Sequence, residues 1–176
     1  MNTEVTLSGF GGQGVLFIGK LLAEAAVTEG KEVSWLPYYG AEKRGGMCSC
    51  YVNIADDKVG SIFNTRPDVG VAMSPAAMEK LEPAVKTGGL LIVNESLVKT
   101  KSKRPDIKTV YIPILEVAGE LGDESVANLV VLGSLIANTQ IVTSSHIMGE
   151  INKMSSKDKR QLELNKAAFM KGCDFS

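Results

Sequence analysis

The sequence predicts an α/β fold: a three-layer α/β/α, Rossmann-like domain whose mostly parallel sheet includes one hairpin. Apolar runs of strand length alternate with helical patterns along the chain, which is typical of a parallel sheet covered by helices on both faces. A glycine-rich turn stands directly between the first apolar run and the first helical pattern, as in βαβ folds. A chain of 176 residues is expected to form one domain over residues 1–176.

In the first half of the chain, hydrophobic periodicity separates the elements and turn residues mark their ends. Gly30 is expected to end the first helix, because a C-terminal glycine readily adopts the left-handed conformation. Residues 56–57, two aspartates, predict the turn of the hairpin. The predicted elements are a strand over 5–7, a helix over 13–29, a strand over 33–36, a polar loop over 37–46, a strand over 47–54 and its hairpin partner over 58–62.

In the second half, two continuous apolar runs predict buried strands and the rest is mainly helical. Ser74 is expected to cap a helix that has Pro75 at its first position. The predicted elements are strands over 69–72, 90–93 and 109–112, and helices over 75–81, 114–119, 126–137, 144–154 and 158–171. The helix over 126–137 is apolar nearly all round, so we expect it to be buried on more than one side.

Composition excludes several classes of protein. The net charge of −1 argues against nucleic-acid or membrane-surface binding, which needs a basic face. No apolar run approaches the roughly 20 residues that span a bilayer. The chain enters its first strand at once, so we expect no signal peptide. Three cysteines predict no disulfide framework and a reducing, cytoplasmic location.

The glycine-rich turn is the first candidate site. Gly9, Gly11 and Gly14 fit the G-x-G-x-x-G spacing, and Gly12 and Gln13 complete the turn. Such a turn brings free N–H groups at a helix N-terminus close to a ligand, so it predicts an anion- or partner-binding loop. A phosphate or sulfate ion would suit these amides. The structural alternative is that the glycines only permit a close crossing of helix and strand.

A dinucleotide-binding site lacks its acidic residue here. Dinucleotide enzymes hold the ribose hydroxyls with an acid at the end of the second strand, about 20 residues on. The strand predicted over 33–36 ends in Leu36 and continues into Pro37, and no carboxylate closes it. We therefore expect NAD, FAD and ATP to bind weakly or not at all.

No catalytic set and no metal site is predicted. Cys48 and Cys50 lie two apart on a predicted strand, so both thiols face the same side, where small buried cysteines are common. Cys173 and the single histidine, His146, are distant in sequence and show no ligand spacing of the zinc or iron–sulfur kind. His146 is expected at the surface, near a helix start.

A second segment, rich in aromatic, charged and glycine residues, follows the second predicted strand. Two alternatives remain open for it: an interface anchored by tyrosine and arginine side chains, or a turn held by a local ion pair between Glu42 and Arg44. Because the segment leaves the carboxyl end of a strand, it should lie beside the glycine turn, at the edge where α/β sheets meet partners. Its candidate interface residues are Tyr39, Gly40, Glu42, Arg44, Gly45 and Gly46.

These segments together resemble the gamma subunit of the 2-oxoacid:ferredoxin (acceptor) oxidoreductases, and most closely the 2-oxoglutarate or branched-chain members. The resemblance extends from about residue 3 to residue 172. It rests on residues 9–14 (GFGGQG), 39–46 (YGAEKRGG), 66–68 (RPD), Asn128 ahead of 132–133 (LG), and 165–169 (NKAAF) ahead of Gly172.

The resemblance implies a role that the residues alone do not show. Such enzymes oxidatively decarboxylate a 2-oxoacid to its acyl-CoA and pass electrons to ferredoxin or a similar acceptor. It implies that thiamine diphosphate, coenzyme A and iron–sulfur clusters are bound through other subunits and that this chain binds none of them alone. It also implies alpha and beta subunits as partners, with a delta subunit in some complexes.

Two hypotheses follow. In the first, the chain is a non-catalytic subunit that docks through the glycine turn and the segment over 39–46, and it is inactive when isolated. In the second, it is a stand-alone nucleotide- or phosphate-binding Rossmann-like protein. The missing acid favours the first.

Overall fold

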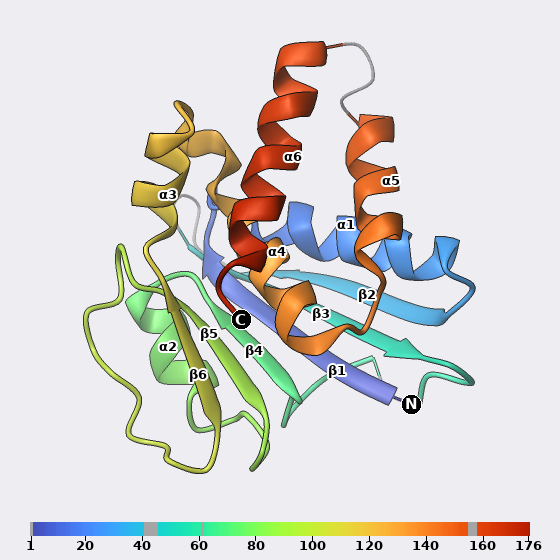
Figure 1. Ribbon diagram of the computed structural model, residues 1–176. Coiled ribbons are helices and arrows are strands. Elements are labelled where there is room, and N and C mark those ends of the chain that lie inside the picture. The colour runs from blue at the N-terminus through green and yellow to red at the C-terminus, as the bar shows by residue number, and fades with distance from the viewer. Residues whose placement is uncertain (1, 41–45, 61, 155–157) are drawn as a thin grey trace.

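The structure, a computed structural model, describes residues 2–40, 46–60, 62–154 and 158–176. It contains a six-stranded sheet with helices on both faces, so the predicted three-layer α/β/α fold is confirmed (Figure 1). The strands are β1 (Asn2–Phe10), β2 (Glu32–Tyr39), β3 (Met47–Ala55), β4 (Val69–Ala72), β5 (Leu90–Asn94) and β6 (Lys108–Ile112). The helices are α1 (Val15–Thr28), α2 (Pro75–Leu81), α3 (Ile114–Glu120), α4 (Ala127–Thr139), α5 (Ser144–Met154) and α6 (Lys159–Cys173), with a short 3₁₀ turn over Glu124–Val126.

The strand order is β2-β3-β1-β4-β5-β6. The half of the sheet from β1 to β6 is parallel, as β1 pairs with β4, β4 with β5 and β5 with β6. The other half is antiparallel, because β3 runs against both β1 and β2. All strands except β3 therefore point the same way, and their carboxyl ends meet at one edge of the sheet.

Both faces of the parallel half are buried, which explains its continuous apolar strands. Along β5, Leu90 and Ile92 face the larger core beneath α1, α4 and α5, whereas Leu91 and Val93 face the smaller core under α2. Helix α4 lies between the sheet and α6, and its residues 129–136 are all buried. The expectation that this helix is buried on more than one side is thus confirmed.

The predicted hairpin between β3 and residues 58–62 is wrong. The described residues of that range are not in a strand, and β3 pairs instead with β1 and with β2. The segment that follows β3 crosses a face of the sheet, where the side-chain amide of Asn64 donates to the Val5 carbonyl at 3.2 Å. β3 therefore lies in the sheet interior between β1 and β2, and the observed hairpin is β2–β3.

The predicted loop over 37–46 begins too early. Pro37, Tyr38 and Tyr39 belong to β2, which is an edge strand. Proline lacks an N–H group and is accepted in edge strands, where one side of the backbone has no neighbour. Across the described residues, no helix combines the length and the apolar character required to cross a bilayer.

Candidate functional site

The glycine turn lies at the carboxyl edge of the sheet, between the end of β1 and the start of α1. Gly12 and Gly14 have φ values of +92° and +75°, in the left-handed region that glycine adopts without steric cost. Gly14 is the N-cap of α1 and has no side chain to accept from the first N–H groups. A Cβ atom at Gly9 would lie 2.7 Å from the Cβ of Met73. Close packing against Met73 therefore leaves room only for glycine at position 9, the first residue of the motif.

The side chain of Gln13 stabilises this turn through two hydrogen bonds. Its side-chain oxygen accepts from the backbone N–H of Phe10 at 2.7 Å, and its side-chain amide donates to the Met73 carbonyl at 3.0 Å. Asn94, at the end of β5, donates to the same carbonyl at 3.1 Å. The amides of Gln13 and Asn94 therefore join the ends of β1, β4 and β5, and Gln13 has a structural part in the turn. Sequence reasoning missed Asn94, because no local motif marks it.

The two sequence-predicted loops meet at this edge. The Gly11 N–H donates to the Gly46 carbonyl at 3.3 Å, and the Gly40 N–H donates to the Met47 carbonyl at 2.8 Å. The second loop therefore ends beside the glycine turn, and its start at Gly40 lies against Met47. Glu42, Arg44 and Gly45 lie outside the described residues.

Exposed aromatic side chains gather at the same edge. Tyr39 is 70% exposed, Tyr38 is 53% exposed and Phe10 is 37% exposed. A Cβ atom at Gly11 or Gly12 would meet no atom within 4 Å, so the backbone there is open to an approaching surface. We call this surface the docking edge; it consists of Phe10, Gly11, Gly12, Tyr38, Tyr39, Gly40 and Gly46.

A cavity of about 180 Å³ lies next to the glycine turn, between the ends of the parallel strands and the starts of α3 and α4. Ligand pockets usually measure about 300–1,000 Å³, so this volume is small for a nucleotide. Asn128, from the first turn of α4, lies against Gly14, where a Cβ atom would be 2.9 Å from its Cγ. Position 14 therefore requires glycine for two reasons: a side chain would collide with Asn128, and the backbone has a positive φ.

Among the described residues, no carboxylate directly follows the end of β2, where a dinucleotide site would have its acid. The strand that sequence analysis compared with a Rossmann second strand is β2, which β3 separates from β1. The strand next to β1 on that side is therefore antiparallel, and it begins with Met47 at the carboxyl edge of the sheet. The cavity does contain one carboxylate among its lining residues, that of Glu124.

Cys48 is paired with Tyr39 of the docking edge, but its side chain is buried, and neither Cys50 nor His146 belongs to that edge. Cys50 is fully buried, with its sulfur under Gly19 of α1, and burial raises the pKa of this thiol to about 12. His146 joins the start of α5 to the end of α1, because its Nδ1 lies 2.7 Å from the Thr143 hydroxyl and 3.1 Å from a Glu29 carboxylate oxygen. Among the described residues, no three histidine, cysteine or acidic side chains gather as a metal site would require.

Comparison with known families gives one match over nearly the whole chain. The family described as pyruvate ferredoxin/flavodoxin oxidoreductase matches residues 4–175. The 2-oxoglutarate synthase subunit KorC of Methanocaldococcus jannaschii is 37% identical over 175 residues, which cover 98% of this chain and 92% of that protein. The ketoisovalerate oxidoreductase subunit VorA of Methanothermobacter marburgensis is 40% identical over 134 residues, or 76% of this chain. The matched region is only 28% of VorA.

A solved structure has the same fold along its whole length. It is the keto/oxoacid ferredoxin oxidoreductase gamma subunit from Geobacter sulfurreducens, with a TM-score of 0.84 and 31% sequence identity. The superposition covers 99% of this chain and 96% of that one.

Proposed function

The chain belongs to the pyruvate ferredoxin/flavodoxin oxidoreductase family, and we propose that it is the non-catalytic gamma subunit of an enzyme that oxidatively decarboxylates a 2-oxoacid to its acyl-CoA. Electrons pass to ferredoxin or a similar acceptor. Residues 1–176 form a single gamma-type domain, and the enzyme works in the cytoplasm.

One observation carries this proposal. The same unit makes up most of a separate subunit, KorC, but only 28% of the longer VorA chain. We infer that the rest of VorA contains segments that this unit contacts, and that a separate unit binds their counterparts non-covalently. We therefore expect this chain to have a surface that fits alpha and beta subunits, and a delta subunit in some complexes.

The docking edge fits that requirement. Tyrosine and arginine are enriched in the parts of interfaces that contribute most binding free energy, and Tyr39 is the most exposed of the large hydrophobic side chains that the structure describes. The open backbone at Gly11 and Gly12 lets a partner approach closely. Glu42, Arg44 and Gly45, which lie outside the described residues, are included in the proposed interface on the basis of the sequence alone.

Thiamine diphosphate, coenzyme A and the iron–sulfur clusters are held through the other subunits in this proposal. The donor set supports this assignment, because the described histidine, cysteine and acidic side chains do not gather. The alternative of a stand-alone nucleotide- or phosphate-binding protein is not favoured, since the small cavity beside the turn suits no whole nucleotide.

We propose 2-oxoglutarate as the 2-oxoacid, on the basis of the nearly full-length similarity to a 2-oxoglutarate synthase subunit. The other relative is named for ketoisovalerate, so the competing substrate is a branched-chain 2-oxoacid. The assembled enzyme should reduce its acceptor fastest with 2-oxoglutarate. A higher kcat/KM with 2-oxoisovalerate would reverse this assignment without affecting the subunit role.

Co-purification with the alpha and beta subunits tests the docking role directly. Tyr39→Ala should lower the amount of this chain that co-purifies, because an exposed aromatic anchor loses its contact with the partner. Met170→Ala is the matched control: Met170 is 54% exposed on α6, away from the docking edge. If both variants co-purify like wild type, or both fall equally, the docking edge is not the interface.

A further inference from the structure

Helix α1 has an unusual outer face. Phe17, Lys20, Glu24 and Val27 form one exposed stripe along the helix, and Thr28 is exposed at its end; Phe17 and Val27 are 40% and 61% exposed. The outer face of an amphipathic helix is normally polar. This stripe instead has an apolar side chain near each end and an ion pair between them, with Lys20 Nζ 3.5 Å from a Glu24 carboxylate oxygen.

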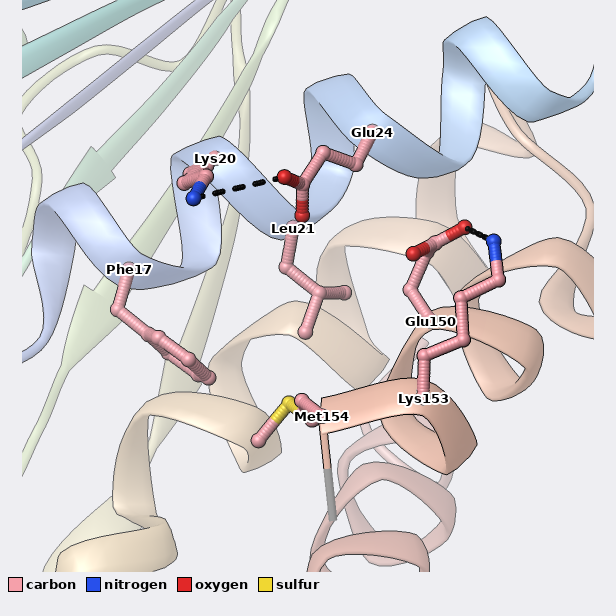
Figure 2. A pocket seen from close by; sticks show the side chains of 7 residues that line it. All are labelled: Phe17, Lys20, Leu21, Glu24, Glu150, Lys153 and Met154. Atoms are coloured by element: carbon pink, nitrogen blue, oxygen red, sulfur yellow. Dashed lines mark hydrogen bonds and ion pairs between the residues drawn. The ribbon is translucent and has the colours of Figure 1, made fainter. Parts of the chain in front are cut away.

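A groove runs along the stripe between α1 and α5. Figure 2 shows the side chains of Phe17 and Leu21, from α1, and of Met154, from α5, pointing into it. Its volume is about 370 Å³, and Met154 is 45% exposed. Phe17, Leu21 and Met154 form the apolar part of the groove lining, and the charged side chains of Lys20, Glu24, Glu150 and Lys153 complete it.

The side chains of the stripe are arranged symmetrically about its centre, with charged residues near the middle and apolar residues at the two ends. Phe17 and Val27 lie at equal distances in sequence on either side of Leu22, and so do Lys20 and Glu24. When two such helices pack antiparallel about a two-fold axis at this position, each Lys20 faces the Glu24 of the other copy. Each Val27 then lies against the other copy's Phe17, beside the groove that contains Met154. A parallel arrangement would instead place like charges together.

We propose that the outer face of α1, with the α1–α5 groove, is a two-fold interface between two copies of this chain. The charge complementarity of the stripe with itself selects this occupant, because a two-fold interface uses the same patch on both subunits. Antiparallel packing also brings opposite ends of the two helix dipoles together. The patch is small, so the dimer is weak and depends on protein concentration. This inference is independent of the docking edge.

Sedimentation velocity of the full chain over a series of concentrations tests the proposal. Wild type should show a reversible monomer–dimer equilibrium. Lys20→Glu and Glu24→Lys should each raise the dissociation constant by about tenfold or more, because each variant places two like-charge pairs across the axis. An equimolar mixture of the two variants should dimerise again, since both cross-axis pairs then have opposite charges.

Lys166→Glu is the matched control. Lys166 Nζ lies 3.3 Å from Glu163 in an ion pair on α6, so this variant also breaks a pair within one helix but leaves the stripe unchanged. It should dimerise like wild type, and circular dichroism should show all variants folded. The proposal is overturned if wild type is monomeric at every concentration, if Lys166→Glu has the same effect as Lys20→Glu, or if the mixture does not recover. A monomeric wild type whose Lys20→Glu variant fails to co-purify with the other subunits would assign the stripe to one of those subunits.

Discussion

Gly133 of α4 and Gly172 of α6 lie against one another with no room for a side chain on either. A Cβ atom at Gly133 would lie 2.9 Å from the Gly172 Cα, and one at Gly172 would lie 3.0 Å from the Gly133 Cα. Each would also collide with a backbone carbonyl of the other helix. The two helices therefore cross in backbone contact, and α6 is held closely over the buried α4.

Gly133→Ala should destabilise the protein, because the new methyl group can be accommodated only if one helix moves. Overpacking of this kind costs about 1–3 kcal/mol, which corresponds to about 2–4 °C in melting temperature per kcal/mol for a chain of this size. Gly149→Ala in α5 is the control, since no atom lies within 4 Å of its added Cβ, and it should leave stability equal or higher. Equal melting temperatures for Gly133→Ala and wild type would show that the helices can separate freely.

Gln13→Ala should loosen the glycine turn. The variant loses the bonds to the Phe10 N–H and the Met73 carbonyl, which together stabilise the fold by about 1–3 kcal/mol. Gln161→Ala removes a side-chain bond within α6 and should have a smaller effect on the melting temperature. If Gln13→Ala melts like Gln161→Ala, the turn is held by its glycines and by helix α1 alone.

Arg44→Ala should weaken assembly more than folding. Truncation of an interface arginine that leaves a partner charge unpaired costs about 2–5 kcal/mol in binding, whereas an exposed loop substitution changes stability by less than about 0.5 kcal/mol. Co-purification measures the first effect and thermal melting of the isolated chain measures the second. Lys80→Ala, an exposed cation on α2, should change neither. A variant that melts several degrees lower and assembles normally would favour the internal ion pair of Glu42 and Arg44.

The cysteines should differ in reactivity. Burial raises the pKa of Cys50 to about 12 and also raises that of Cys48, so both thiols stay protonated at neutral pH and are covered by α1. Cys173, at the end of α6, is only partly buried. A maleimide reagent should therefore modify Cys173 first, and Cys48 and Cys50 only after denaturation, as measured by mass spectrometry. Rapid labelling of the folded Cys173→Ser variant would contradict this order.

Acid should destabilise the contact between α1 and α5. Glu150 accepts from the Lys153 ammonium at 2.6 Å and from the Thr28 hydroxyl at 3.0 Å, and the Lys153 bond is the main cause that lowers its pKa from the usual 4.5. The unfolded chain therefore takes up this proton first as the pH falls. The stabilisation is fully present above pH 4.5 and is lost as the pH falls through the lower pKa of the folded state. Melting curves of Glu150→Gln should fall less steeply with pH in that window than those of wild type, and parallel curves would exclude this carboxylate.

Local patterns predicted most elements of the fold but not how the strands pair. Strands β4 and β5 and the Ser74 cap of α2 can be predicted from the sequence, because each depends on residues that are neighbours along the chain. The partner of β3 was predicted wrongly, since an alternating strand does not specify which of several strands lies beside it. That choice depends on burial of both edges of β3 by β1 and β2.

The candidate site was predictable to a similar extent. The glycines predict a turn and the tyrosines predict an exposed surface. The order of the strands places both at one edge of the sheet. The bonds of Gln13 and Asn94 to the Met73 carbonyl could not be foreseen, because they join residues that are far apart in sequence. Asn128 entered only through the resemblance, and its contact with Gly14 supplies the physical reason for its presence.

The position of β1 in the sheet has a consequence for biosynthesis. This strand leaves the ribosome before the other strands of the sheet, and both of its neighbours, β3 and β4, are made later. The β2–β3 hairpin is local and closes a short loop, whereas insertion of β1 beside it requires a long-range contact, and such contacts form slowly. The nascent β1 strand therefore has two unpaired edges until β3 has emerged, and one until β4 has emerged. During that interval it is exposed to chaperones and to association with other unfinished chains.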